Sequence, residues 1–472
     1  MALFHSFSSF SLLFFFFVTL FSISYQQPVL NSAEQDSVYQ VLDSINSDIP
    51  WRSLFPGDLC SSAPHGVVCD YFSETTSNDS SSVDTVHVVE LNFGYVSDYT
   101  PNPPCSPNST LSPLLFTSFK YLRKLFFYKC FTDTRVVSVP DITPSFVSTL
   151  EELVLVDNPS LVGPIGWLLC NLTNIRRAIV TGNGVDGKIP DGIGGLVNLA
   201  EFTLSRNRLS GEMPLGLAKL KKLKVLDLSH NYLDGNVPES MGNLTELLKL
   251  DLSYNELSGK IPESLKAMQK LEFLDLSFNR FGNFGVPLFL SEMLRLREVY
   301  LSGNQLGGKI PENLWNNLGG VTGIGFSDMG LVGSIPASMG LHLRNLCFLG
   351  IDNNKLEGTV PEEFGLLEFI NEINLENNRL SGRVPFSAKL SVKMGQKLKL
   401  AGNPELCVDE GLRSLKNSSS LGKLKVCKKP YLPNPVIFCG DSSAQAQPKP
   451  RTLPSMFMII GLLFIFMCQL DF

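Results

Sequence analysis

Hydrophobic and polar positions repeat along most of this chain with a spacing of 24 or 25 residues. The segment LDLSHNYLDGNVP (226–238) matches LDLSYNELSGKIP (250–262) at eight of thirteen positions. A repeat of this length predicts a solenoid, in which each coil packs only on its neighbours. The register is kept through Asn158, Asn183, Asn207, Asn231, Asn255, Asn279, Asn304, Met329, Asn354, Asn378 and Asn403.

Each repeat predicts one short strand followed by a turn. Leu226 and Leu228 face inward, while Asp227 between them faces outward. Asn231 can both donate to and accept from backbone groups of the turn, and Gly235 suits a positive φ. Stacked coils should therefore form a parallel sheet on the concave side and a second, broken strand row near the G-x-I-P segments. Successive coils should bury Leu228, Leu252 and Leu276.

The G-x-I-P segments resemble the plant-specific extracellular leucine-rich repeats of receptor kinases, receptor-like proteins and polygalacturonase inhibitors. The resemblance covers about Trp51 to Cys427 and implies an α/β-type solenoid, a right-handed superhelix with disulfide-capped ends. Met329 at an Asn position and NRFGNFGVP (279–287), which lacks the usual Gly, depart from the pattern. Two weaker coils precede Asn158, one built on Val89 and Leu91 and one ending at Cys130.

Two segments point to a narrower group. FSDMGLVGSIPAS (326–338) and FSAKLSVKMGQKLKLAGNPELC (386–407) resemble the receptor-like-protein subgroup of Too Many Mouths and Piriformospora indica-insensitive protein 2. The cysteine-containing coil LFFYKCF (125–131) fits the same subgroup.

Both ends of the chain are apolar. Residues 1–24 are typical of a secretory signal peptide, with a membrane helix as the alternative. Residues 455–472 form a hydrophobic tail after a linker (441–454), and the small residues from Ser442 favour a lipid anchor over a single membrane span. The chain is therefore expected at the extracellular face of the cell membrane. N-glycosylation acceptors occur at Asn78, Asn108, Asn171, Asn243 and Asn417.

The resemblance also implies how the solenoid is capped. PGDLCSSAPHGVVCD (56–70) is similar to the plant N-terminal cap, without its usual Trp between the cysteines. We expect a cap with a first degenerate coil (25–110), repeats (111–405) and a C-terminal cap (406–440). The implied disulfides are Cys60–Cys69, Cys105–Cys130 and Cys407–Cys427, although a sequence alone leaves connectivity open. Cys170 and Cys347 are expected to be small buried hydrophobes.

Little in the sequence predicts catalysis. The five histidines have no metal-ligand spacing, and no kinase motif occurs, so we expect neither an enzyme nor a cofactor or metal. The net charge of −6 does not favour nucleic acid as a partner.

Binding is then expected on the concave strand face. Three aspartates at one strand position should form an outward row that a basic partner or counterion would relieve, with aromatic residues beside it. The same residues also fit ordinary repeat consensus. The candidate contacts are Thr203, Arg206, Asp227, His230, Asp251, Tyr254, Asp275, Phe278 and Tyr300.

The resemblance implies a cell-surface receptor-like protein. Such a protein binds an extracellular peptide or partner ectodomain and signals through a leucine-rich-repeat receptor kinase as co-receptor, in development or in response to microbes. The alternative is a secreted inhibitor of wall-degrading enzymes, similar to the polygalacturonase inhibitors, which generally lack a hydrophobic tail. A wall-structural scaffold would be expected to carry a Pro-rich tract, which this chain lacks.

Overall fold

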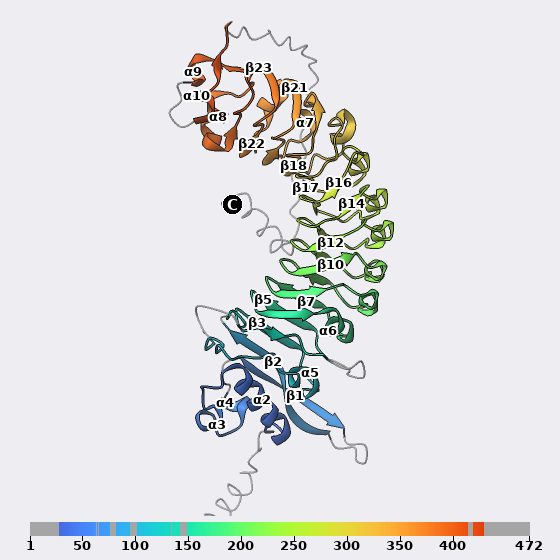
Figure 1. The fold of residues 1–472 in the computed structure, drawn as a ribbon, viewed down its shortest axis with the longest axis vertical. Helices are drawn as coiled ribbons and strands as arrows, with labels where there is room; N and C mark the ends of the chain where they lie inside the picture. Colours follow the sequence, from blue (N-terminus) through green and yellow to red (C-terminus); the bar gives the residue numbers. More distant parts are fainter. Residues whose placement is uncertain are drawn as a thin grey trace, which may run out of the picture. The chain divides into compact units, whose positions relative to one another are not determined.

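The chain forms two compact units, Met1–Cys130 and Phe131–Phe472, in a computed structural model (Figure 1). The residues that the structure describes are 28–62, 64, 66–75, 82–94, 102–133, 135–141, 149–413 and 419–428. The signal peptide, the linker, the hydrophobic tail and the candidate sites Asn78, Asn417 and Ser442 lie outside these residues.

The N-terminal unit packs short helices on three strands. Its helices are α2 (Ser32–Ile45), α3 (Trp51–Leu54), α4 (Leu59–Ser62) and α5 (Leu114–Thr117). Strand β1 (Val67–Thr75) pairs antiparallel with β2 (Ser82–Gly94), which pairs in parallel with β3 (Lys124–Tyr128). Helix α2 begins after Asn31, whose side chain accepts a hydrogen bond from the Ala33 N–H, and it buries its apolar face.

One detail of the first weak coil differs from the expectation. The register passes from Val68 opposite Glu90 to Cys69 opposite Val88, so Val89 is an extra residue in β2. The bulge reverses the alternation of side chains along the strand. Val88 is therefore fully buried, whereas Val89 is only partly buried.

The second unit is a solenoid with two rows of parallel strands. Figure 1 shows the first row along the inner side of the curve of this unit. Its strands follow the order β5 (Glu152–Val156), β7 (Arg177–Thr181), β9 (Glu201–Thr203), β11 (Val225–Asp227), β13 (Lys249–Asp251), β15 (Phe273–Asp275), β17 (Glu298–Tyr300), β18 (Gly323–Gly325), β20 (Phe348–Gly350), β22 (Glu372–Asn374) and β24 (Leu398–Lys399).

The second row is broken into three sheets. They are β4 (Val137–Ser138), β6 (Leu161–Pro164), β8 (Gly184–Gly187), β10 (Arg208–Glu212) and β12 (Tyr232–Asp234); then β14 (Ser258–Gly259) and β16 (Arg280–Phe281); then β19 (Val332–Gly333), β21 (Lys355–Thr359), β23 (Arg379–Arg383), β25 (Glu405–Val408) and β26 (Lys425–Val426). One break follows the irregular repeat 279–287, where Asn283 takes a positive φ of 53°.

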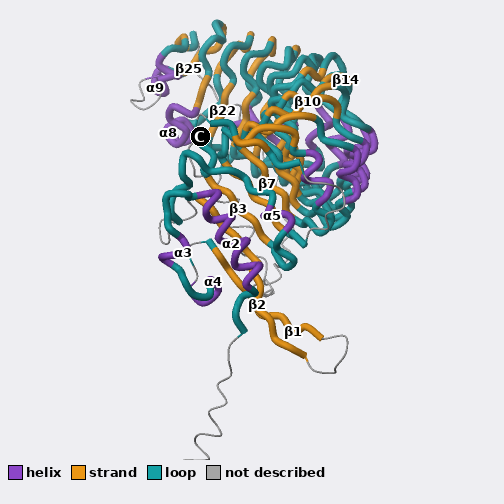
Figure 2. Tube along the Cα trace, turned by 60° about the horizontal axis from the view of Figure 1, so that its bottom comes forward, coloured by secondary structure: helices purple, strands orange, loops and turns teal. Residues whose placement is uncertain are grey.

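Short helices complete each coil and gather on one side of the strands (Figure 2). Most begin directly after the proline of the G-x-I-P segment. They are α6 (Gly166–Asn171), η1 (Asp191–Gly195), η2 (Leu215–Lys219), η3 (Glu239–Asn243), η4 (Glu263–Ala267), η5 (Leu288–Glu292), η6 (Glu312–Trp315), α7 (Ala337–His342), η7 (Glu362–Leu366), α8 (Ala388–Met394), η8 (Gly395–Lys397), α9 (Glu410–Arg413) and α10 (Ser419–Gly422).

The core of the solenoid confirms the predicted register. Leu228, Leu252 and Leu276 each have 0% of their surface exposed. The Asn255 amide donates to the carbonyl oxygens of Leu228, Leu252 and Ser253, and its oxygen accepts from the Leu233 N–H. Because one side chain satisfies backbone groups of adjacent coils, the asparagine column holds the turns in place without burying unpaired polar groups. The predicted solenoid, with its parallel sheet and broken second row, is confirmed.

Candidate functional site

The residue before each asparagine has a left-handed backbone. Its φ is 52–55° wherever it is not glycine, including Asp328 before Met329. In most coils this residue is Gly, Asp or Asn, which tolerate the conformation. These residues are Asp157, Gly182, Gly303, Asp328, Asn353, Asn377 and Gly402. Four consecutive coils instead carry Arg206, His230, Tyr254 and Phe278. Bulky side chains are rare in this conformation, so these coils bear a backbone cost that the others avoid.

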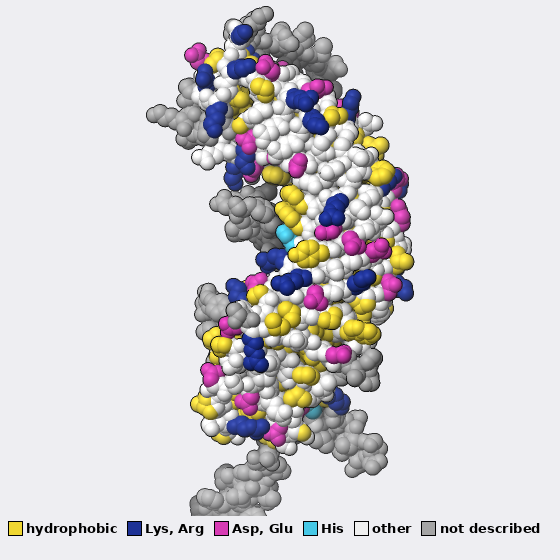
Figure 3. Space-filling view, in the orientation of Figure 1, with side chains coloured by type: hydrophobic (Ala, Val, Ile, Leu, Met, Phe, Trp, Pro, Cys, Tyr) yellow, Lys and Arg dark blue, Asp and Glu magenta, His cyan; other side chains and the backbone are white. Residues whose placement is uncertain are grey.

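Three of these residues form a stack of rings, here called the aromatic ladder: His230, Tyr254 and Phe278. The ring centroids of His230 and Tyr254 are 4.1 Å apart, and those of Tyr254 and Phe278 are 4.3 Å apart. Tyr254 is 44% exposed and Phe278 is 46% exposed. Figure 3 shows hydrophobic and histidine side chains along the inner face of this unit. The ladder is therefore an accessible apolar surface, and its flat rings are in contact with water.

Glycines at both ends of the column give room to its side chains. A Cβ at Gly303 would lie 2.6 Å from the Phe278 ring, so that ring extends over the next coil. At the other end, Gly182 lets Arg206 reach past one coil to Asp157, with 3.5 Å between Nη2 and Oδ1. The arginine continues the ladder as a half-exposed cation.

The three aspartates stack at one register position, here called the acid row: Asp227, Asp251 and Asp275. The expectation that this row points outward is wrong for its central member, because Asp251 is only 9% exposed. Its Oδ1 accepts from the Ser253 hydroxyl at 2.7 Å. Lys249 Nζ lies 3.0 Å from Asp227 Oδ2 and 3.4 Å from Asp251 Oδ2, so one ammonium bridges two carboxylates.

Asp275 differs from its two neighbours. Its Oδ1 accepts from the Ser277 N–H at 2.8 Å, and it has no ion pair within the part of the chain that the structure describes. Burial, followed by the nearby charge of Asp251, raises the pKa of Asp275 to about 6. Burial would lower the pKa of Lys249, but Asp227 and Asp251 outweigh it and raise that pKa. The acid row is thus only partly neutralised from within.

Tyr300 follows Asp275 at the same register position and lies over a floor of glycines. A Cβ at Gly325 would lie 2.6 Å from the Tyr300 ring, and one at Gly323 would lie 2.7 Å from its hydroxyl oxygen. The hydroxyl donates to Glu298 Oε2 at 2.8 Å. Thr203 starts the same column beside Asp227 and is partly buried. The structure therefore brings the candidate contact residues onto one face.

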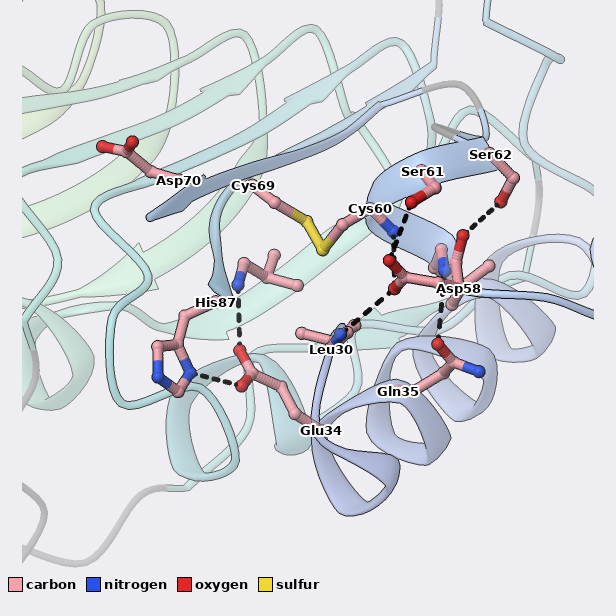
Figure 4. The surroundings of a disulfide bond; sticks show 12 residues. Leu30, Glu34, Gln35, Asp58, Cys60, Ser61, Ser62, Cys69, Asp70 and His87 are labelled. Carbon is pink, nitrogen blue, oxygen red and sulfur yellow. Dashed lines mark hydrogen bonds and ion pairs between the residues drawn. A yellow bond between two sulfur atoms is a disulfide. The ribbon is translucent and has the colours of Figure 1, made fainter. Parts of the chain in front are cut away.

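The N-terminal unit holds polar contacts that sequence reasoning missed. Cys60 is bonded to Cys69, and Asp58 accepts from the Leu30 N–H and the Ser61 hydroxyl beside it (Figure 4). Glu34 binds His87 Nδ1 at 2.8 Å and accepts from the Val88 N–H. These contacts tie the cap to its strands. The disulfide was expected, but the partners of the Leu30–Asp58 and Glu34–His87 contacts are far apart in sequence, so no motif marks them.

The remaining predicted modifications are placed as follows. The other two disulfides join Cys105 to Cys130 and Cys407 to Cys427, the pairs that the resemblance implied. Cys170 and Cys347 belong to none of these three disulfides and are only partly buried, which corrects the expectation that both are core residues. Asn108 and Asn243 are exposed, whereas the Asn171 amide donates to the Trp167 carbonyl oxygen at 3.0 Å.

None of the helices among the described residues has the length and hydrophobicity needed to cross a bilayer. Among the same residues, no three His, Cys, Asp or Glu side chains are grouped so that they could hold a metal ion.

Comparison with known proteins agrees with this architecture. Leucine-rich-repeat family models match residues 221–281 and 295–317. TOO MANY MOUTHS of Arabidopsis thaliana is 36% identical over 147 residues, which are 30% of this chain and 26% of that protein. Piriformospora indica-insensitive protein 2 of Arabidopsis thaliana is 33% identical over 162 residues, 34% of this chain and 35% of that protein. The matches thus span only about a third or less of these relatives' length.

A solved structure supports the fold alone. The PEPR1–AtPEP1 structure matches with a TM-score of 0.53 at 22% identity, over 82% of this chain and 54% of that chain. Repeat pattern, solenoid and sequence matches agree. The chain is therefore a leucine-rich-repeat solenoid, and part of it is similar in sequence to the plant proteins TOO MANY MOUTHS and Piriformospora indica-insensitive protein 2.

Proposed function

We propose that this chain is a receptor-like protein of the cell surface that binds an extracellular peptide or partner ectodomain on the inner strand face of its solenoid. The observation that carries the proposal is the placement of Arg206, Tyr254 and Phe278 at left-handed backbone positions. Each such residue costs on the order of 1–3 kcal/mol relative to glycine. Glycine, Asp or Asn would fold equally well there, so retaining large rings favours a role in recognition.

The surroundings of the ladder support the same role. Exposed aromatic rings supply large contact areas at protein interfaces, and they do so with little loss of side-chain freedom. The acid row lies in the same coils and offers charge beside the apolar surface. A ligand that crosses the strands would meet both features at once.

Attachment and signalling are further parts of the proposal. A lipid anchor at Ser442 would hold the solenoid at the membrane, and a leucine-rich-repeat receptor kinase would carry the signal inward. The solved structure of PEPR1 with AtPEP1 is a precedent for a complex on this fold.

The test is affinity capture of the full chain from plant membranes, followed by identification of the proteins and peptides bound. The variant is Tyr254→Asn combined with Phe278→Asn, because asparagine suits the backbone at both positions. Tyr232→Asn is the matched control, since Tyr232 is 58% exposed but lies in the second strand row. We expect the ladder variant to lose its partner at least tenfold and the control to keep it. Equal capture by both variants would refute recognition through the ladder, and a wall-degrading enzyme as the sole partner would favour the inhibitor function.

A further inference from the structure

An ion pair inside the protein shows how a cation binds to the acid row. The side chain of Lys249 extends from strand β13 and places its ammonium between Asp227 and Asp251. The same ammonium lies 5.1 Å from the centroid of the Phe273 ring, within the range of a cation–π contact. Two carboxylates and one aromatic face thus form a complete site for one cation.

The next coil also has a carboxylate beside aromatic rings, but an aromatic residue stands at the position of the lysine. The register places Phe273 where Lys249 stands one coil earlier, and Glu298 follows Phe273. The Phe273 and Tyr300 ring centroids lie 5.8 Å apart, so an aromatic wall is present. Asp275 supplies the carboxylate, but no lysine or arginine side chain of the described residues pairs with it. One ammonium is therefore shared among three stacked carboxylates.

The other charged and titratable groups facing Asp275 do not supply a cation either. Strand β13 contributes Asp251 and the already shared Lys249. Tyr254 faces it from the ladder, since the charge of Asp275 contributes to raising the Tyr254 pKa. Strand β17 contributes Tyr300 and Glu298, which bind each other. Two arginines close to β15 and β17 in the chain, Arg280 and Arg297, pair with Glu256 and Glu272.

We propose that the face formed by the acid row and the aromatic ladder binds an extended peptide segment bearing a lysine or arginine, whose cation lies at Asp275 against the Phe273 and Tyr300 rings. A neighbouring apolar side chain of the peptide packs on Tyr254 and Phe278. This inference rests on the proposed function and names the chemistry of its ligand. Charge complementarity decides the occupant, because an acidic or neutral segment would leave the excess carboxylate unpaired at a half-buried position.

The test is selection from a displayed library of random peptides on the full chain, purified from plant cells. Three proteins are compared: the unchanged chain, Asp275→Asn and the matched control Asp234→Asn, in which an exposed carboxylate of the second strand row is removed. We expect peptides selected by the unchanged chain and by the control to be several-fold enriched in lysine and arginine. The enrichment should disappear with Asp275→Asn. Peptides without this enrichment, or with the same enrichment on Asp275→Asn, would overturn the proposal.

A selected basic peptide then serves as the probe for binding measurements. Replacing its lysine with norleucine should weaken binding about tenfold, the scale of one charge pair in a half-buried site. Because a bound cation favours the ionised form of Asp275, binding should tighten as the pH rises from 5 to 7.5, and Asp275→Asn should flatten this dependence.

The two proposals fail in different ways. Selected peptides that are not basic, yet lose binding when Tyr254 and Phe278 are changed to Asn, would end the charge inference and leave recognition by the ladder standing. Peptides that are basic but bind the ladder variant unchanged would place the charged contact outside the proposed surface and overturn both. Thermal unfolding of each variant shows that the proteins compared are folded.

Discussion

Two stretches of the same strand face differ in what they present. From β11 to β15 the face carries the acid row and the aromatic ladder, with exposed rings and a partly neutralised set of carboxylates. From β17 to β20 it carries Gly323, Gly325 and Gly350, and Tyr300 lies over Gly323 and Gly325. A buried apolar core lies beneath both stretches, and the asparagine turns are shared except at Met329. The repeat therefore fixes a scaffold, and the surface positions are free to specialise.

The shared core should respond alike in both stretches, and it gives the largest expected effect. Leu252 and Ile351 each have 0% of their surface exposed. Leu252→Ala and Ile351→Ala should each lower the free energy of unfolding by about 2–5 kcal/mol, because each leaves a cavity. Denaturant unfolding measures both. A cost below about 1 kcal/mol in either coil would show that the two stretches do not share one packed core.

The second largest change in stability is expected at the glycines beneath Tyr300, which only the second stretch has. A Cβ at Gly325 would lie 2.6 Å from the Tyr300 ring. We expect Gly325→Ala to displace this ring and to destabilise the protein by about 1–3 kcal/mol, the usual cost of overpacking. Gly320→Ala is the matched control, because nothing lies within 4 Å of its added carbon. Equal stability of the two variants would contradict the close seat of Tyr300.

The acid row predicts a pH dependence confined to the first stretch. The Asp275 pKa is raised from 3.8 to about 6, so between these values the folded chain binds more protons than the unfolded chain. Its contribution to stability therefore falls as the pH rises through this window. Asp275→Asn cannot ionise, so it should be more stable than the unchanged protein at pH 7.5 by on the order of 1 kcal/mol, with the gain vanishing near pH 4. Thermal unfolding from pH 4 to 7.5 measures this, and a gain that grows toward low pH would reverse the assignment.

Substitutions of the residues with a left-handed backbone before the asparagines should give the smallest changes in stability. The changes should have opposite signs in the two stretches. Tyr254→Asn relieves the backbone but loses ring stacking, so we expect stability to change by less than about 0.5 kcal/mol. Asn353→Tyr introduces a ring at the equivalent position of the second stretch, where φ is 55°, and should cost about 1 kcal/mol. Denaturant midpoints of the two variants test this. A stable Asn353→Tyr protein would mean that the rings of the ladder carry no backbone cost.

The repeat period predicted most of the scaffold. It located the strands, the buried leucines and the asparagine turns, because one side chain at each position must face the core for the coils to stack. Met329 shows the tolerance of this rule: the side chain is fully buried, and Asn354 Oδ1 accepts from the Met329 and Leu331 N–H groups. The neighbouring coil thus supplies the missing polar contact.

The candidate site was predictable only in part. The sequence placed Asp227, Asp251 and Asp275 in one row, since positions 24 residues apart occupy equivalent places in adjacent coils. It could not show that Lys249 bridges two of them, because the reach of a long side chain depends on rotamers and neighbours. For the same reason it assigned Asp251 to the solvent side, although hydrogen bonds and the lysine stem bury this carboxylate.

The sequence by itself determined the solenoid, its core and the residues that share a column, because these follow from a period that every coil obeys. Only the tertiary structure decided the contacts, the burial and the charge state of the residues in each column. Contact across coils stacks His230, Tyr254 and Phe278, and it places Tyr300 over Gly323 and Gly325. It also leaves Asp275 without an ion pair among the residues that the structure describes. Local sequence fixes which way a side chain leaves the strand. Its burial, its partners and its charge state are set by the coils on either side, which the chain reaches only 24 residues earlier or later.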